Sequence, residues 1–266
     1  MNRRLQTASR AARAAGKLLR EKFNTPRTVR SKGKRDIVTD ADYAAESTVR
    51  DILLTRFPQD LFLSEEGDAA ERQALWDQVT SNDDLGLWVV DPLDGTTNYA
   101  RRQPTFSVSI ALVRRGAVQV GVVYDPMRDE LFAAERARGA YLNGQRIAAS
   151  HIGKFANAVI GTEWARAQPL RERTAALLAR MAVRVMSVRC GGSAALSLSY
   201  IAAGRLDAYF HLSLYPWDVA AGALLIEEAG GRVTTLQGEP WSVHSQAYVA
   251  TNGHLHRQML AYFRNR

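Results

Sequence analysis

The sequence predicts an α+β fold built from stacked layers of helices and sheets, and two observations support this prediction. Short apolar runs separated by turn residues fill the first half of the 266-residue chain, which is typical of an antiparallel sheet. In the second half, strand-like runs alternate with helix-like segments. The pattern changes near Ser150, but no repeat, low-complexity tract or Pro/Ser-rich linker separates the halves. We therefore predict a single domain over residues 1–266, with sub-halves of about 1–150 and 151–266.

Apolar spacing predicts the elements of the first half. Apolar residues recur at steps of three and four from Leu5 to Phe23, which predicts an amphipathic helix that ends before Pro26. The same spacing predicts a second helix over Asp40–Phe57. Five short apolar runs predict strands, at Asp60–Ser64, Leu87–Val90, Ser107–Arg114, Ala117–Tyr124 and Leu131–Glu135. Arg114-Arg115-Gly116 and Asn143-Gly144 are typical of tight turns.

The second half contains three predicted helices between short predicted strands. The helices are expected near Pro169–Met181, Ser193–Ala203 and Val219–Ala229. The strands are expected near Ala158–Gly161, Arg184–Val188, Ala208–Phe210, Gly231–Thr234 and Ala247–Thr251. This alternation predicts an α/β arrangement for residues 151–266.

Composition excludes several classes of protein. A hydrophobic fraction of 46% excludes a disordered or collagen-like chain. The single cysteine, Cys190, excludes a disulfide framework and a cysteine-based zinc or iron–sulfur site, and we expect it to be a small packing residue. No apolar run approaches the roughly 18–20 residues of a membrane span. We therefore expect a cytoplasmic protein with no membrane partner.

The net charge of +8 comes from the N-terminal segment. Residues 1–35 contain 12 of the 35 basic residues but only one of the 27 acidic residues, Glu21, so the rest of the chain is slightly acidic. Three interpretations of the basic helix remain open. It is the solvated face of an ordinary packing helix, a surface for a polyanion or protein partner, or an organellar transit peptide.

The most informative motif runs from Asp91 to Thr97, directly after the predicted strand Leu87–Val90. Pro92 lacks an N–H group, so we expect the strand to end at Asp91 and Asp94 to point at the same spot. Two adjacent carboxylates repel each other unless a cation lies between them. Oxygen ligands without nearby Cys or His favour Mg²⁺ or Mn²⁺ over zinc. The alternative is an acidic surface turn with a helix cap.

The backbone after Asp94 is suited to phosphate. Gly95 permits a close backbone approach, and a helix that opens at Thr96-Thr97 presents free N–H groups and the positive end of its dipole.

Three further acidic segments strengthen the metal-site interpretation. Ser64-Glu65-Glu66 ends an apolar strand, Asp36–Asp42 leads into the second helix with Thr39 or Asp40 as its N-cap, and Trp217-Asp218 opens another helix. Each has an ordinary explanation on its own: a common strand ending, a cap, or a favourable helix-dipole charge. Their joint occurrence favours a shared cation site.

Together these motifs resemble the inositol monophosphatase family, within the lithium-sensitive, metal-dependent phosphatases. Gly121–Met127, Gly139–Gly144 and Gly192–Ala195 also read as family sequence, so the resemblance covers nearly the whole chain in the family's order. Thr97-Asn98 favours the inositol monophosphatase branch over the nucleotide-bisphosphate branch, whereas Leu63-Ser64 before the two glutamates favours the reverse. The resemblance implies a layered α/β/α/β/α sandwich of the inositol monophosphatase and fructose-1,6-bisphosphatase type.

The resemblance also implies three sets of site residues. Two or three Mg²⁺ ions, with Mn²⁺ as the alternative, would be held by Glu65, Asp91, the backbone carbonyl of Leu93, Asp94 and Asp218. The attacking water would be oriented or deprotonated by Glu65, Thr96 and Asp42. The substrate would contact Gly95, Thr96, Ser193, Ala194 and His211.

His211 departs from the family pattern. Many members carry a glutamate seven residues before the aspartate that corresponds to Asp218, where it binds inositol hydroxyls; this chain has His211 there. Imidazole hydrogen-bonds a hydroxyl but is not a fixed anionic acceptor. The change leaves the metal ligands intact, but the resemblance then does not define which alcohol the phosphate ester carries. The alternative is a partly buried histidine at a strand end.

The expected function is a Mg²⁺-dependent phosphomonoesterase that hydrolyses myo-inositol 1-phosphate or a related sugar or polyol phosphate with metal-activated water. One alternative is a phosphatase for 3′-phosphoadenosine phosphates, fructose 1,6-bisphosphate or histidinol phosphate. Another is a binding protein that contacts RNA or a transcription complex through the basic N-terminal helix. The resemblance further implies a homodimer and inhibition by lithium.

Overall fold

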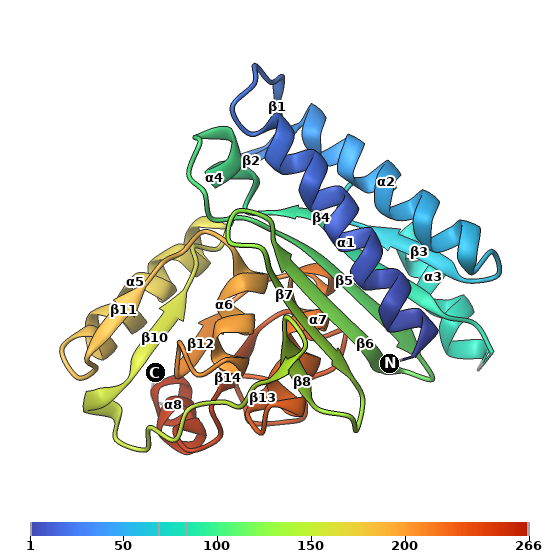
Figure 1. Cartoon of the computed structure of the whole chain (residues 1–266). Helices are drawn as coiled ribbons and strands as arrows, with labels where there is room; N and C mark the ends of the chain where they lie inside the picture. Colours follow the sequence, from blue (N-terminus) through green and yellow to red (C-terminus); the bar gives the residue numbers. More distant parts are fainter. Residues whose placement is uncertain (1, 69, 83, 265–266) are drawn as a thin grey trace.

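Helices and sheets form five layers in the computed structural model, which describes residues 2–68, 70–82 and 84–264 (Figure 1). Helices α1 (Arg3–Lys22) and α2 (Asp40–Arg56) lie side by side on one face of a seven-stranded sheet. Helices α6 (Ala194–Ala202) and α7 (Pro216–Glu228) fill the space between this sheet and a five-stranded sheet. Helices α5 (Gln168–Ala182) and α8 (His256–Arg264) cover the far face of the smaller sheet. The predicted α/β/α/β/α sandwich is confirmed.

The larger sheet has the strand order β3-β4-β5-β6-β7-β8-β9. Its strands are β3 (Leu61–Ser64), β4 (Leu87–Asp94), β5 (Ser107–Arg114), β6 (Ala117–Asp125), β7 (Glu130–Glu135), β8 (Ala140–Leu142) and β9 (Gln145–Arg146). All neighbouring strands are antiparallel except β3 and β4. This parallel pair departs from the predicted antiparallel pattern because helix α3 (Glu71–Ser81) forms a crossover between the two strands.

The smaller sheet has the order β11-β10-β12-β14-β13 and is mixed. Strands β10 (Val159–Thr162), β11 (Ser187–Arg189) and β12 (Ala208–His211) are parallel, whereas β13 (Arg232–Thr234) and β14 (Tyr248–Thr251) pair antiparallel. The helices between β10, β11 and β12 supply the crossovers that parallel strands need. The second half therefore combines parallel strands joined by helices with an antiparallel pair.

Three expectations about local structure are wrong. Strand β4 continues through Pro92 to Asp94 instead of ending at Asp91, because its pairing with β5 shifts register between Asp91 and Asp94 and proline is tolerated at such a bulge. Strand β11 begins at Ser187, since residues 184–186 close the turn after α5. Cys190 is exposed and is not a packing residue.

Several short elements lie outside the sequence predictions: α3, β8, β9, α8, the 3₁₀ turn Phe155–Asn157 and the hairpin of β1 (Val29–Gly33) and β2 (Asp36–Thr39). Every residue of β1 is exposed, so the strand has no apolar alternation to predict it. The hairpin lies at the end of α1 beside α4 (Thr96–Ala100) (Figure 1).

Alternating side chains of the larger sheet hold the layers together. In β4, Leu87 and Val89 pack toward α6 and α7, whereas Trp88 and Val90 pack toward α1 and α2. At Gly121 in β6, a Cβ atom would lie 2.7 Å from the backbone oxygen of Ala221, so the absence of a side chain lets α7 approach the sheet closely. None of the described helices combines the length and apolar character needed to cross a membrane.

Candidate active site

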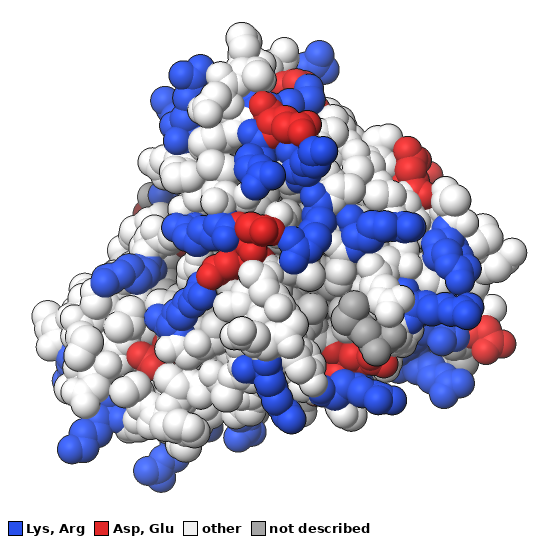
Figure 2. Space-filling view, viewed as in Figure 1, with Lys and Arg blue, Asp and Glu red and all other residues white. Residues whose placement is uncertain are grey.

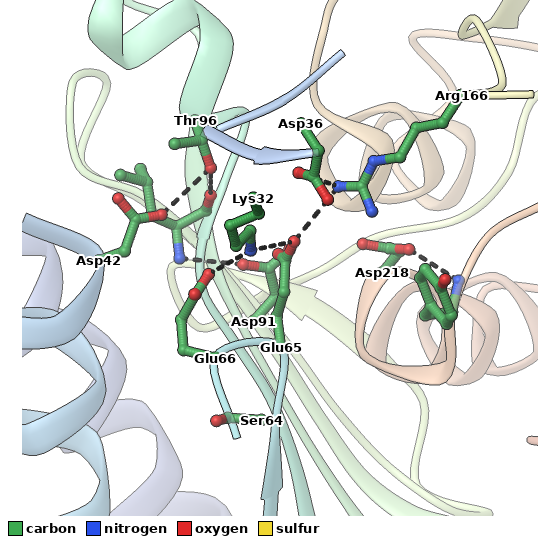
Figure 3. Close-up of polar contacts among 12 residues, drawn as sticks. Lys32, Asp36, Asp42, Ser64, Glu65, Glu66, Asp91, Thr96, Arg166 and Asp218 are labelled. Atoms are coloured by element: carbon green, nitrogen blue, oxygen red, sulfur yellow. Dashed lines mark hydrogen bonds and ion pairs between the residues drawn. The ribbon is translucent and has the colours of Figure 1, made fainter. Parts of the chain in front are cut away.

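Three carboxylates from separate elements converge above the sheet (Figure 3). Glu65 directly follows β3, Asp91 lies in β4, and Asp218 lies in the first turn of α7. Each offers a carboxylate oxygen, and these oxygens all lie within 4.8 Å of one another. Asp91 and Asp218 are buried and Glu65 is partly exposed. The residues that the sequence placed in separate motifs therefore form one cluster.

The electrostatics of this cluster suit a hard divalent cation. Burial, reinforced by the charges of Glu65 and Asp94, raises the pKa of both Asp91 and Asp218 well above its usual value. Buried like charges at this separation destabilise each other unless a proton or a cation compensates them. The donors are all oxygens, as Mg²⁺ and Mn²⁺ prefer, so the residues present fit such an ion.

Asp94 lies beside the cluster with its oxygens turned to the start of α6. They accept hydrogen bonds from Ser193 Oγ at 2.5 Å and from the backbone N–H groups of Ala195 at 2.8 Å and Ala194 at 3.3 Å. Burial raises the pKa of Asp94 to about 6. Ser193 and Ala194, predicted substrate contacts, thus hold a predicted metal ligand in this structure.

Thr96 and Asp42 form a hydrogen-bonded pair next to the cluster (Figure 3). Thr96 Oγ1 lies 3.1 Å from Asp42 Oδ1 and 3.0 Å from the carbonyl oxygen of Leu93, and either oxygen can accept the single proton of the hydroxyl. Asp42 also completes the capping box of α2, because its Oδ2 accepts from the N–H and the hydroxyl of Thr39. Burial raises the pKa of Asp42 to about 6.

Gly95 forms the sharp turn between β4 and α4. Its φ of 98° lies in the left-handed region, and a Cβ there would lie 3.0 Å from the carbonyl oxygen of Thr105. The turn leads directly from Asp94 into the first turn of α4; contact of its N–H groups with phosphate stays a prediction.

Two cations at the cluster were not predicted from the sequence. Lys32 Nζ, from the β1–β2 hairpin, lies 3.1 Å from Glu65 and 2.8 Å from Glu66. Arg166 Nη2, from the loop after β10, lies 2.8 Å from Asp36 and 3.3 Å from Glu65. Lys32 lies in a basic stretch that resembles ordinary surface, and no motif distinguishes Arg166.

His211 is the last residue of β12 and its side chain is buried, with 2% of the residue exposed. The backbone N–H of Ser213 donates to its Nδ1 at 3.0 Å. Burial, with a contribution from the charge of Arg166, lowers the pKa of the ring to about 4, so the imidazole is neutral at neutral pH.

Comparison with known proteins gives a consistent result. The inositol monophosphatase family matches residues 1–266. Nus factor SuhB of Escherichia coli strain K12 is 40% identical, with 100% of this chain and 97% of that protein aligned. Inositol monophosphatase 2 of Solanum lycopersicum is 39% identical over 94% of each chain.

Solved structures agree with the sequence comparison. The extragenic suppressor protein suhB of Bartonella henselae superposes with a TM-score of 0.89 at 34% identity, covering 98% of both chains. An IMPase of Thermotoga maritima superposes with a TM-score of 0.87 at 32% identity, covering 98% of this chain and 96% of that one. The chain therefore belongs to the inositol monophosphatase family.

Proposed function

We propose that the protein is a Mg²⁺-dependent phosphomonoesterase that hydrolyses myo-inositol 1-phosphate or a related sugar or polyol phosphate. The observation that carries this proposal is the cluster of Glu65, Asp91 and Asp218, with the Thr96–Asp42 pair beside it. Family membership and the similarity to a tomato inositol monophosphatase support the same reaction.

Different residues of the chain would have different roles in hydrolysis. Divalent cations bound by the carboxylates, including Asp94, would neutralise the phosphate and lower the pKa of water. Thr96 shares its proton with Asp42 or the Leu93 carbonyl, so its oxygen lone pairs are free to accept a hydrogen bond from water and orient it. Gly95 and Thr96 would present N–H groups to the phosphate oxygens at the start of α4. Positioning and charge compensation account for most of the catalysis of such a reaction.

Phosphate release from a substrate panel, measured against Mg²⁺ concentration, tests the proposal. We expect hydrolysis of myo-inositol 1-phosphate or another polyol phosphate that requires Mg²⁺ and stops with a chelator. The panel includes 3′-phosphoadenosine 5′-phosphate, fructose 1,6-bisphosphate and histidinol phosphate, so that another ester is identified if it is preferred. Absence of Mg²⁺-dependent release from every ester would contradict the proposal.

The buried carboxylates make the effect of Mg²⁺ on stability depend on pH. Burial raises the pKa of Asp42 and Asp94 from 3.8 to about 6, so the folded state binds protons more tightly than the unfolded state. Their contribution to stability is complete below pH 3.8 and is lost as the pH rises through about 6. Mg²⁺ bound by Asp94 would compete with its proton, and the charge of the ion would favour the ionised form of the neighbouring Asp42. We therefore expect the rise in Tm caused by Mg²⁺ to grow between about pH 5 and pH 8.

Thermal melts with Mg²⁺ and with a chelator, at matched pH and ionic strength, measure this effect. The difference between the two melts cancels groups that Mg²⁺ does not touch, such as His256, whose pKa is lowered to about 4 by burial. A Mg²⁺ effect on Tm that stays constant over this pH range would contradict the expectation.

Association with transcription machinery is a second candidate function, because relatives at 40% identity over the whole chain are named Nus factors. The basic N-terminal segment would provide the contact surface. Seven of its twelve basic residues already contact acidic groups, carbonyl groups or an amide oxygen within the chain, namely Arg4, Arg13, Lys17, Lys22, Arg27, Lys32 and Arg35. Figure 2, which views the molecule from the same side as Figure 1, shows Lys and Arg scattered over the visible surface with acidic residues among them.

Exposed arginines of α1 permit a direct test of this second role. Deletion of residues 1–35 is unsuitable because α1 buries Leu5, Ala12 and Leu19 against the sheet. The double variant Arg10→Glu, Arg20→Glu instead changes two exposed side chains. A salt-dependent shift with RNA or a purified elongation complex should weaken in this variant. Unchanged binding would exclude this surface.

A further inference from the structure

Arg166 and His211 leave the smaller sheet at the same edge. Strands β10 and β12 are parallel neighbours, and Thr162 pairs with Phe210. His211 directly follows Phe210, and Arg166 lies in the loop that follows Thr162. Carboxyl ends of parallel strands are the usual place for ligands in α/β sheets. Both residues are therefore placed for contact with a molecule bound at the carboxylate cluster.

The guanidinium of Arg166 extends over this cluster, pointing between Asp36 and Asp218 (Figure 3). The ion pairs of Arg166 with Asp36 and Glu65 both use Nη2. Among the residues that the structure describes, none accepts a hydrogen bond from its Nε or Nη1, and 47% of the side chain is exposed. A planar guanidinium therefore has donors left for an anionic group.

His211 adds a second donor. Since its Nδ1 accepts the N–H of Ser213, the proton of the neutral ring lies on Nε2. Within residues 2–68, 70–82 and 84–264, no side chain or carbonyl group bonds to this Nε2, although the residue is only 2% exposed. This nitrogen is not among the fully buried side-chain atoms that lack a partner, so it is accessible and its N–H can donate to an acceptor on a bound ligand. His211 thus offers a hydrogen-bond donor, whereas the glutamate that many family members carry at this position would only accept a hydrogen bond.

We propose that Arg166 and His211 select phosphate monoesters whose alcohol carries a second anionic group, either a phosphate or a carboxylate. A neutral polyol can use donors or acceptors equally, whereas an anionic group requires donors and positive charge. The inference rests on the proposed phosphatase function. A cation bound by Glu65 would compensate the negative charge of the Glu65 side chain. Arg166 would then be released from its ion pair with Glu65 and keep the one with Asp36.

Matched pairs of esters that differ only in the second anion test the inference. Fructose 1,6-bisphosphate is compared with fructose 1-phosphate, and 2-phosphoglycerate with glycerol 2-phosphate, which separates a phosphate from a carboxylate. We expect kcat/KM to favour the doubly anionic member of at least one pair by about tenfold or more, as for one charged hydrogen-bonded pair. Arg166→Ala should reduce that ratio to near one, whereas Arg173→Ala, at an exposed position on α5, should leave it unchanged.

Two further variants separate recognition from a purely structural role of Arg166. Asp36→Asn removes its competing carboxylate, so the preference for the doubly anionic ester should rise. His211→Phe fills similar space without a donor, so the preference should fall. The inference would be overturned if the ratio of kcat/KM between the two esters of a pair were the same in wild type and in Arg166→Ala. It would also be overturned if Arg166→Ala lowered kcat/KM equally for both esters of each pair.

Binding measured without turnover keeps the inference separate from the proposed reaction. In a Thr96→Val variant with Mg²⁺, titration calorimetry should show fructose 1,6-bisphosphate binding about tenfold tighter than fructose 1-phosphate, and the difference should disappear when Arg166→Ala is added. If no ester is hydrolysed, the phosphatase proposal fails while calorimetry still decides the inference. If esters are hydrolysed but the two sugars bind equally, only the inference fails.

Discussion

Replacement of Asp91 by asparagine is expected to abolish Mg²⁺-dependent phosphate release. Asp91 is fully buried between Glu65 and Asp218, and an amide there removes one negative charge from the cation site. Charge stabilisation by a bound cation is worth several kcal/mol in the transition state, so we expect a loss of about a thousandfold or more in kcat/KM. Titration calorimetry should show weakened Mg²⁺ binding in parallel.

Stability distinguishes this effect from misfolding. The asparagine relieves like-charge repulsion, so the metal-free variant should melt at or above the Tm of the metal-free wild type. Asp129→Asn is the matched control, because Asp129 is an exposed carboxylate that pairs with Arg13 away from the cluster. A variant at Asp91 with wild-type activity and Mg²⁺ affinity would remove the basis of the proposed mechanism.

Thr96→Val is expected to lower kcat with little change in Mg²⁺ affinity. Valine keeps the branched shape of threonine but removes the hydroxyl that bonds Asp42 and the Leu93 carbonyl. Positioned proton-transfer groups contribute about a hundredfold to ten-thousandfold, so we expect a decrease of that order in kcat. Thr97→Val, at the exposed next position of α4, is the control and should retain activity.

Combining Thr96→Val with Asp42→Asn tests whether the two residues act together. Residues that act as one unit give non-additive losses, so the double variant should be little worse than either single variant. Fully multiplicative losses in kcat would show that Thr96 and Asp42 contribute independently and would contradict the pairing as a functional unit.

The layers and the cluster of Glu65, Asp91 and Asp218 could be predicted because each leaves a local signal. Apolar periodicity predicts α1, α2 and the long strands, and acids that directly follow apolar strands or open helices predict the metal site. The bulge at Pro92 has no such signal, because it depends on pairing with β5. Lys32 and Arg166 also could not be predicted, since their role depends on long-range contacts.

The turn of Asp94 toward α6 shows a further limit. Two acids three residues apart predict a shared direction, but the free N–H groups at the start of α6 and the hydroxyl of Ser193 compete for Asp94. Which of these partners Asp94 contacts depends on packing between the halves of the chain. Local spacing therefore locates the site without settling how each ligand is oriented.

The origin of Asp218 in the second half of the chain has a consequence for folding kinetics. Glu65 and Asp91 belong to the first half, so the cluster is complete only after α7 docks on the sheet. Contacts between distant segments form late, because their loop-closure entropy must be offset first. A cation bound at the finished cluster stabilises the native state more than the transition state. The bound cation would therefore slow unfolding and leave the refolding rate nearly unchanged, which would increase the kinetic stability of the contact between the two halves.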